Sequence, residues 1–496
     1  MDRQIRKLGA ALLVLFLALF VQVNYLQVIA ADELANHPGN VKRQLIAEYD
    51  VLRGKILAKD GKTVLAQSVE STPGDEFRYL RTYPQGALYG HLTGFYSIVS
   101  GRTGLERSFN EYLTGSADDL VPQRFIDEIR GRDPRGASVI TTLDPVLQQI
   151  AADALDGRRG AVAAIDPRTG EVLALVANPS FDPNPLASHD AAKARRAFEK
   201  LDVDTFGQKP LISNASQERF PPGSTFKIVT AAAALENGHG PDSLWDNPLV
   251  FDLPESSNTI PNFGGSHCLG GAAKITLAQA LQISCNVTFA AVGDTLGAEL
   301  LVGQAERFGF DQDIPSAVDF AEGTIPDPEY FEDRVADVAN SAIGQGSVAT
   351  NPLHMALIAG AIGNGGTLMV PQFVLEIRDS TGRIVRSFGS EEYGETMSEQ
   401  SAQTLTTMMV SVVDAGTGTA AQIPGISVAG KTGTAQQGGG RDPHAWFVSF
   451  APAQNPTIAV AVIVMDGGDL GSEATGGAAA APIAKAVIQA SLEGSG

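Results

Sequence analysis

The sequence predicts an α/β chain of the α+β kind: an antiparallel sheet covered by helices, a smaller domain before it, and one apolar N-terminal helix. Three observations support this prediction. The chain has 496 residues, too many for one ordinary domain, and 44% of them are hydrophobic, as in a globular protein. A long apolar stretch follows the N-terminus. Strand-like runs lie at both ends of the longer C-terminal part, with helical stretches between them.

The N-terminus predicts a membrane anchor. Basic residues precede an apolar stretch that runs from Leu8 to about Val28, and about 20 such residues can span a bilayer. The charges on either side predict a cytoplasmic tail and an extracytoplasmic remainder. A signal peptide cleaved near Ala31 is the alternative, but the stretch exceeds the roughly 7 to 15 residues of a signal core. We therefore expect residues 1–31 to form the tail and a single-pass anchor in the cell membrane.

Residues 32–136 are predicted to form the smaller domain. They combine short strand-like runs with Gly and Pro punctuation, and Asp60-Gly61 marks the turn of a hairpin. The charged, Gly-rich passage 130–136 is typical of a linker. The larger domain should therefore cover residues 137–496.

The larger domain opens with a helix pattern after Thr141. Two apolar runs, 161–165 and 171–176, then flank a Pro/Gly turn and predict a hairpin. Three more strand candidates and a final helix lie near the C-terminus, at 428–435, 445–451, 457–465 and 478–492. The hairpin and the three later strands together predict a five-stranded antiparallel sheet.

Charge and cysteine content exclude some partners. The 56 acidic and 36 basic residues give a net charge of -20, and no long basic run occurs, so we expect no nucleic-acid partner. The two cysteines, Cys268 and Cys285, could form a disulfide in an exported protein; two free thiols are the alternative. His267 adjoins Cys268, but this set is incomplete for zinc. We expect neither a metal site nor a cofactor.

The first chemical motif is Pro-Pro-Gly-Ser-Thr-Phe-Lys, which ends at Lys227 and opens an apolar helical segment. Ser224 is expected in the first helical turn, where backbone N–H groups favour developing negative charge. Lys227 lies three residues further on the same helix face, so its amine can take the proton of the serine hydroxyl. Because a free lysine has a pKa of about 10.4, this chemistry requires burial or a second cation.

Lys431 is the candidate second cation, in the motif Lys-Thr-Gly-Thr. The motif continues an apolar strand that becomes polar at one side of a cleft. There the ammonium and the hydroxyls of Thr432 and Thr434 suit a carboxylate. Gly433 is expected to let a substrate backbone approach, because a side chain at that position would obstruct the cleft.

The third motif is Ser284-Cys285-Asn286, between two helical stretches. Thr276 and Gln279 predict a capping box for the first stretch. A junction between helices can point two polar side chains into a cleft. Taken alone, however, the motif is better explained as an ordinary turn.

The order of the three motifs, Ser-x-x-Lys at 224, Ser-x-Asn at 284 and Lys-Thr-Gly at 431, resembles the penicillin-recognising serine acyltransferases. The remaining chain is similar to class B penicillin-binding proteins. This similarity rests on pedestal motifs around Arg53-Gly54, Asp60-Gly61 and Gly104-Leu105-Glu106, and on Gly344-Gln345-Gly346, Asn351-Pro352-Leu353 and His444-Ala445-Trp446-Phe447. The resemblance implies the penicillin-binding transpeptidase fold, shared with serine β-lactamases, on a smaller pedestal domain.

The resemblance also implies residue roles. Ser224 would be the nucleophile and Lys227 the general base, while Ser284 and Lys431 would pass a proton to the leaving amine. Substrate contacts would come from Asn286, Thr432, Gly433 and Thr434, and backbone N–H groups of Ser224 and Thr434 would form the oxyanion hole. A Cys268–Cys285 bond would tether the loop from about Asn262 to Gly270 beside this site.

The implied activity is that of a peptidoglycan D,D-transpeptidase, which cross-links stem peptides of a lipid-linked precursor or nascent glycan and is inhibited by β-lactams. D,D-carboxypeptidase activity is an alternative because both reactions share the acylation step. A membrane sensor or scaffold that binds β-lactams or muropeptides is another. Residues 32–136 are too few for a glycosyltransferase, so polymerisation is expected from a separate membrane enzyme in a division or elongation complex. A deacylating Glu-x-x-Leu-Asn site, as a β-lactamase would need, does not follow Ser284.

Overall fold

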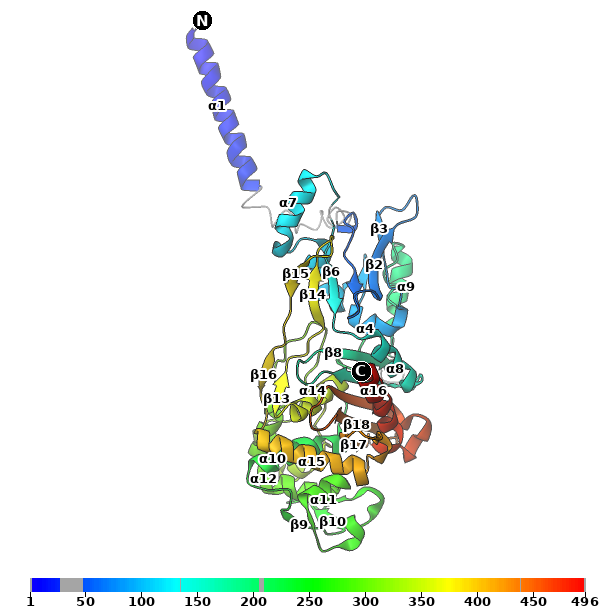
Figure 1. Cartoon of the computed structure of the whole chain (residues 1–496). Coiled ribbons are helices and arrows are strands. Elements are labelled where there is room, and N and C mark those ends of the chain that lie inside the picture. Colours follow the sequence, from blue (N-terminus) through cyan, green and yellow to red (C-terminus); the bar gives the residue numbers. More distant parts are fainter. Residues whose placement is uncertain (1, 27–47, 134, 205–208, 438, 495–496) are drawn as a thin grey trace.

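The computed structural model describes residues 2–26, 48–133, 135–204, 209–437 and 439–494. Helix α1 (Asp2–Asn24) stands at one end, followed by a narrow domain and then a wider one (Figure 1). Within the described ranges, one helix is long and apolar enough to cross a membrane by length and composition, and its window is Arg3–Asn24. The alternative cleavage point near Ala31 lies outside the described residues.

The wider domain is built on a five-stranded antiparallel sheet, as predicted. The strand order is β17-β18-β19-β7-β8. Their bounds are Gly160–Ile165 for β7, Val172–Asn178 for β8, Ala429–Ala435 for β17, His444–Ala451 for β18 and Ile458–Val464 for β19. Every residue of β7, β18 and β19 is buried, which explains why these segments read as continuous apolar runs rather than as alternating ones. Strand β17, which carries Lys431, lies at an edge of the sheet.

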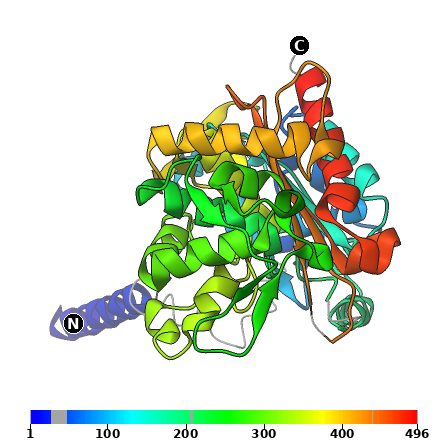
Figure 2. The same cartoon turned by 90° about the horizontal axis from the view of Figure 1, so that it is seen from below.

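Helices cover both faces of this sheet. Helices α8 (Pro145–Leu155) and α16 (Ala481–Gly494) pack on one face. On the other face lie α14 (Pro352–Gly363), which is buried along almost its whole length, and a layer made of α10 (Lys227–Glu236), α11 (Leu277–Gln282), α12 (Asn286–Arg307) and α15 (Glu399–Ala415). Figure 2 shows α16 in red and the green-to-yellow helices on opposite sides of the strands.

The narrow domain contains a six-stranded sheet of order β15-β14-β6-β1-β2-β3. Strands β1 (Ile56–Leu57) and β2 (Val64–Glu70) form the predicted hairpin. Gly61 at its turn has φ +64°, and the Asp60 carboxylate accepts hydrogen bonds from the backbone N–H groups of Lys62 and Thr63. The Asp-Gly signal thus has a direct structural cause.

This sheet crosses the predicted domain boundary at residue 136. Strands β14 (Val374–Arg378) and β15 (Ile384–Ser387) come from the C-terminal part, and β14 pairs with β6 (Ser138–Thr141), which pairs in turn with β1. The sheet is completed by β3 (Tyr79–Thr82). The pairing joins segments more than 200 positions apart, so hydrophobic patterning in either segment could not reveal it.

A cluster of three charged side chains, Arg53, Arg81 and Glu106, lies buried inside the narrow domain. Arg53 and Arg81 each donate a hydrogen bond through Nε to one oxygen of Glu106, at 2.7 Å and 2.6 Å. Their side chains are 3%, 1% and 0% exposed, respectively. Burial alone would raise the pKa of Glu106, but the two guanidinium groups outweigh it and lower that pKa. The carboxylate therefore remains charged and binds both arginines.

Candidate active site

Ser224 lies in a short 3-10 turn, η5 (Gly223–Phe226), that runs directly into α10. The first turn of the predicted helix, which contains Ser224, is thus a 3-10 turn, and the α-helix proper begins at Lys227. Gly223 has φ +53°, and a Cβ there would lie 2.7 Å from the carbonyl oxygen of Thr434, so only glycine fits against β17. Thr225 and Phe226 are buried, whereas Ser224 is partly exposed. The turn thus presents the serine to solvent from a rigid base.

Lys227 is completely buried one residue after the turn. Its amine donates hydrogen bonds to the side-chain oxygen of Asn286 at 2.7 Å and to the carbonyl of Ser284 at 2.8 Å. The Ser284 hydroxyl lies 3.5 Å from the same nitrogen. The spacing of the motif predicts that the Lys227 amine can reach the Ser224 hydroxyl. Within the described residues, Lys227 makes no hydrogen bond to Ser224. Hydrogen bonds of a catalytic base often tighten only when substrate is bound.

Lys431 supplies the predicted second cation. Its buried amine donates to the Ser284 hydroxyl at 2.8 Å and to the carbonyl of Thr432 at 2.8 Å. Burial lowers the pKa of Lys431 to about 7. Burial, and then the charge of Lys431, lower the pKa of Lys227 well below the ordinary lysine value. The surroundings of Lys227 thus combine burial with a second lysine, and each of these lowers the pKa of a lysine.

Ser284 occupies the gap between α11 and α12, as predicted, and contacts both lysines. The predicted capping box of Thr276 and Gln279 begins α11. Ser284 has φ +61°, a left-handed conformation that is costly for a residue with a side chain. Such backbone strain persists where surrounding contacts hold it, and here Lys227 binds the carbonyl while Lys431 binds the hydroxyl.

Gly433 is also constrained by the turn that carries Ser224. A Cβ on Gly433 would lie 2.8 Å from the carbonyl oxygen of Pro222 and 2.9 Å from the methyl group of Thr225. A side chain would therefore first displace the turn that carries Ser224. The glycine lets β17 and the nucleophile turn pack together, which the sequence motif alone did not reveal.

Thr417 is a residue at this site that the sequence reasoning missed. Its hydroxyl lies 2.6 Å from the hydroxyl of Thr432, and the residue is exposed in the segment after α15. Thr434 is partly exposed on the same strand as Thr432. No local pattern around Thr417 distinguishes it from an ordinary loop threonine, since its role depends on a partner 15 positions away.

The loop before α11 binds the third motif at three points. Cys268 and Cys285 form a disulfide. Asn262 is buried, and its side-chain oxygen accepts hydrogen bonds from the backbone N–H groups of Asn286 at 3.0 Å and Val287 at 3.2 Å. The Asn286 side chain donates to the carbonyl of Pro261 at 3.0 Å. Asn262 thus caps α12 from a distance, a role no helix-start signal at residue 285 could indicate.

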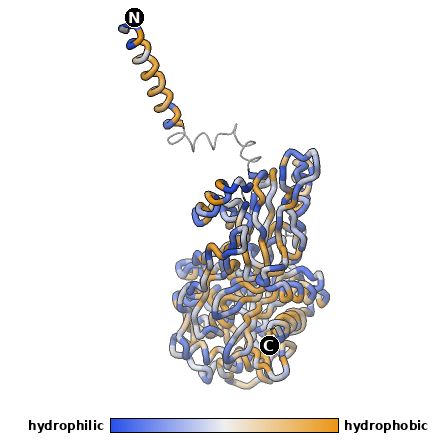
Figure 3. Tube along the Cα trace, turned by 45° about the horizontal axis from the view of Figure 1, so that its top comes forward, coloured by the Kyte–Doolittle hydropathy of each residue, from blue (hydrophilic) through white to orange (hydrophobic). Residues whose placement is uncertain are grey.

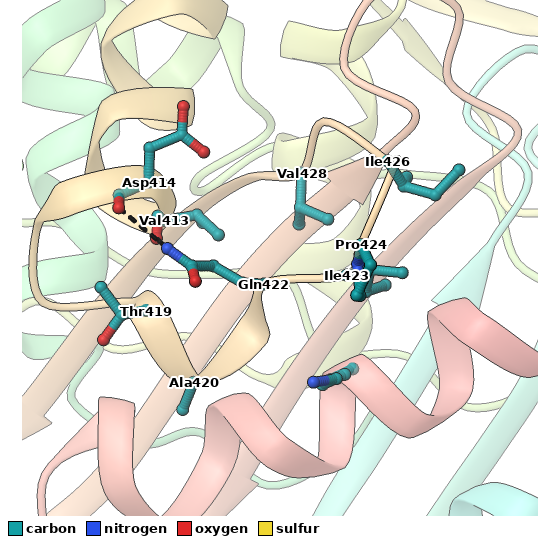
Figure 4. A pocket seen from close by; sticks show the side chains of 10 residues that line it. Val413, Asp414, Thr419, Ala420, Gln422, Ile423, Pro424, Ile426 and Val428 are labelled. Carbon is teal, nitrogen blue, oxygen red and sulfur yellow. Dashed lines mark hydrogen bonds between the residues drawn. The ribbon is translucent and has the colours of Figure 1, made fainter.

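A cavity of about 500 Å³ lies elsewhere, between the C-terminal end of α15, the turn η9 (Thr419–Ala421) and α16 (Figure 4). Val413, Val428 and Lys485 are among its lining residues, and Gln422 donates to the carbonyl of Asp414 at its edge. It contains none of the motif residues. As for metals, the described residues include no group of three or more His, Cys, Asp or Glu side chains that could hold an ion.

The fold and this site define a serine acyltransferase: a presented hydroxyl, two buried lysines and a bridging second serine beside an edge strand. The profile of the penicillin-binding protein transpeptidase domain matches residues 160–489, and that of the penicillin-binding protein A dimerisation domain matches residues 53–139. The chain therefore belongs to the penicillin-binding protein transpeptidase family, and its dimerisation domain identifies it as a class B member.

Individual relatives agree with this assignment. The chain is 42% identical to the peptidoglycan D,D-transpeptidase PbpA of Mycolicibacterium smegmatis and 39% identical to that of Mycobacterium tuberculosis H37Rv, over the full length of all three chains. A ceftriaxone acyl-enzyme complex of penicillin-binding protein A from M. tuberculosis has a TM-score of 0.84 and 40% identity, and covers 90% of this chain and 100% of that one. The chain is therefore similar over most or all of its length to proteins named PbpA or penicillin-binding protein A.

Proposed function

We propose that this chain is a peptidoglycan D,D-transpeptidase that cross-links stem peptides through an acyl-enzyme on Ser224, and that β-lactams acylate the same serine. The observation that carries the residue assignment is the buried Lys227 amine, whose pKa is lowered by burial and by Lys431. A lysine amine that is neutral at neutral pH can take the proton of a serine hydroxyl. The names of the relatives favour transpeptidation over the carboxypeptidase and sensor alternatives.

In the acylation step, the Ser224 oxygen attacks the carbonyl of the penultimate D-Ala of a stem pentapeptide, and Lys227 takes the hydroxyl proton. The carbonyl oxygen becomes an oxyanion, which the backbone N–H groups of Ser224 and Thr434 would stabilise. The bond to the terminal D-Ala then breaks. Its nitrogen receives a proton through the Ser284 hydroxyl, which Lys431 contacts at 2.8 Å.

In the second step, an amine of a neighbouring stem peptide attacks the ester, loses a proton to the same lysine and serine groups, and frees Ser224. Asn286 would hold the substrate amide, since its side chain is fixed by Lys227 and by Pro261. The hydroxyls of Thr432 and Thr434 would bind the terminal carboxylate of the donor. A β-lactam would follow the first step only.

We also propose that the chain is anchored in the cell membrane. Residues 1–31 would hold it in the membrane as a single-pass protein, with the pedestal (32–136) and the transpeptidase domain (137–496) outside the cytoplasm. Helix α1 supports the anchor by its length and composition. The glycan strands would come from a separate membrane glycosyltransferase in a division or elongation complex.

Two experiments test these proposals. Incubation with a reporter penicillin should add its mass to the wild type and leave the Ser224→Ala variant unlabelled in intact-mass spectra; equal labelling would overturn the nucleophile assignment. A thioester donor offered with D-amino acids then tests the acceptor. Aminolysis should exceed hydrolysis, whereas mainly hydrolysis would make the enzyme a carboxypeptidase.

A further inference from the structure

Helix α7 (Val121–Ile129) of the pedestal carries its apolar side chains on the outside. Val121, Phe125 and Ile129 are 46%, 63% and 70% exposed and, being four residues apart, form one stripe along the helix. Ile126 beside them is 41% exposed. None of these four belongs to a hydrophobic cluster of the described residues. Figure 3 shows the helix at the end of the pedestal nearer α1.

The polar side of α7 faces the protein instead. Asp127 is the one residue of the helix that is buried; it accepts a hydrogen bond from Gln123 at 2.9 Å and forms an ion pair with Arg132 at 3.6 Å. Polar residues of this side line a cavity of about 360 Å³ together with Asp379 and Ser380, from the turn after β14. The polar side of the helix therefore faces the cavity it shares with the rest of the pedestal, and the apolar stripe faces outward.

Helix α7 lies close to the point where the described pedestal begins. The segment after α7 joins the first described residues of the pedestal, since Leu52 pairs with Arg135 and its carbonyl accepts a hydrogen bond from Gly136 at 3.0 Å. Glu48, where the described pedestal begins, follows Leu26 of the anchor segment by 22 positions. A chain of that length reaches at most about 80 Å. Figures 1 and 3 both show α7 at the end of the pedestal nearer α1.

Charge around the stripe fits a lipid headgroup layer. Four arginines, at 124, 130, 132 and 135, lie within or just after α7 in a chain of net charge -20. The acidic residues around α7 are Asp118, Asp119, Asp127, Glu128 and Asp133. Three of them are paired: Asp119 with Arg386, Asp127 with Arg132 and Asp133 with Arg78. Arg124, Arg132 and Arg135 line the cavity on the polar side of α7. An apolar stripe with arginines on the polar side is typical of a helix that lies in a membrane interface.

We propose that α7 lies in the outer interface of the membrane, with Val121, Phe125 and Ile129 entering the acyl boundary. The pedestal then has two membrane contacts, the anchor and α7, which fix its tilt and the direction in which it carries the catalytic domain. This inference rests on the membrane anchor of the proposed function. An apolar surface of another membrane protein is the alternative occupant.

The test uses the full chain in phosphatidylglycerol and phosphatidylethanolamine vesicles, with single cysteines labelled by an environment-sensitive NBD fluorophore. Because Cys268 and Cys285 are bonded to each other, an introduced cysteine is the thiol that takes the label. The variants are Phe125→Cys on the stripe, Glu128→Cys on the cavity-lining side of the same helix, and Leu249→Cys, which is exposed in the distant strand lobe beside β10 (Val250–Asp252).

The label at position 125 should be quenched by spin-labelled lipid several-fold more than labels at 128 and 249, with a blue-shifted emission. Quenching at 125 no greater than at 249, in protein that floats with the vesicles, overturns the α7 contact while leaving the anchor intact. Protein that fails to float overturns both. If the label at position 125 is shielded from solvent in native membranes but not in pure lipid vesicles, the stripe binds a protein partner, and the lipid contact is overturned.

Discussion

The two domains each bury a cluster of cationic side chains, and the clusters differ in what balances their charge. In the pedestal, Arg53 and Arg81 share the carboxylate of Glu106. In the transpeptidase domain, Lys227 and Lys431 share the neutral hydroxyl of Ser284, and neither forms an ion pair with a carboxylate of the described chain. One cluster therefore keeps its charges, and the other favours loss of a proton.

The difference separates a structural use of buried charge from a chemical one. Glu106 is held ionised because two guanidinium groups outweigh its burial. Lys431 has no such compensation, so burial brings its pKa to about 7, and its charge adds to the burial that lowers the pKa of Lys227. Arginine suits the first role because it stays protonated, and lysine suits the second because it can be deprotonated. Exchanging or removing members of each cluster should therefore give opposite results.

The largest expected effect is on acylation in the Lys227→Ala variant. Loss of the base should lower the rate constant for reporter-penicillin acylation by about 10²- to 10⁴-fold. The variant should remain folded, because the change removes a buried amine without leaving an unpaired counter-charge. Lys485→Ala, at the cavity beside α16, is the matched control and should keep the wild-type rate. If the Lys227→Ala variant is acylated at a rate within threefold of wild type, Lys227 is not the base and the lysine cluster has no chemical role.

Glu106→Gln should have the opposite profile. It leaves two buried guanidinium groups without their carboxylate, which should cost about 3 to 5 kcal/mol of unfolding free energy. The folded fraction should still be acylated at the wild-type rate. Asp133→Asn, which breaks the exposed pair with Arg78, serves as a reference and should cost about 0 to 1 kcal/mol. Equal effects of the two variants on thermal unfolding would mean that the buried cluster is not structural.

Loss of the disulfide should have a smaller effect than the two changes above, and this effect should be confined to the transpeptidase domain. Replacing Cys268 and Cys285 together with serine opens a loop with a sequence separation of 17, which should cost about 3 kcal/mol of stability. Acylation should slow by less than tenfold, because Asn262 still holds the start of α12. Thiol labelling of the unreduced, denatured wild type should find no free thiol. Two labelled cysteines would contradict the bond.

The sequence predicted well those features that depend on short-range pattern. The five strands follow from continuous apolar runs, the Thr276–Gln279 box from a helix-start signal, and the hairpin at Gly61 from Asp-Gly. The order of the motifs led to the family, and the structure brings Lys227, Ser284 and Lys431 into one hydrogen-bonded group. The roles assigned to these residues remain predictions until the variants are measured.

Features that depend on distant partners were beyond the sequence. Strand β14 joins the pedestal sheet across more than 200 positions, and Asn262 caps a helix that starts 24 positions later. The packing of Gly433 against the nucleophile turn was likewise not predicted, whereas its expected role in substrate approach stays a prediction. In each case the determining contact lies between segments whose proximity only the folded chain shows.

The central claim is that Lys227 is available as a base because its cluster is buried, cationic and uncompensated. Its most direct test is the pH dependence of Ser224 acylation by a reporter penicillin, compared between wild type and Lys431→Met. The wild-type rate should rise through an apparent pKa well below the ordinary lysine value of 10.5. Without Lys431 the remaining amine should hold its proton to higher pH, so the rising limb should move upward. A limb near pH 10.5 in both proteins would contradict the account.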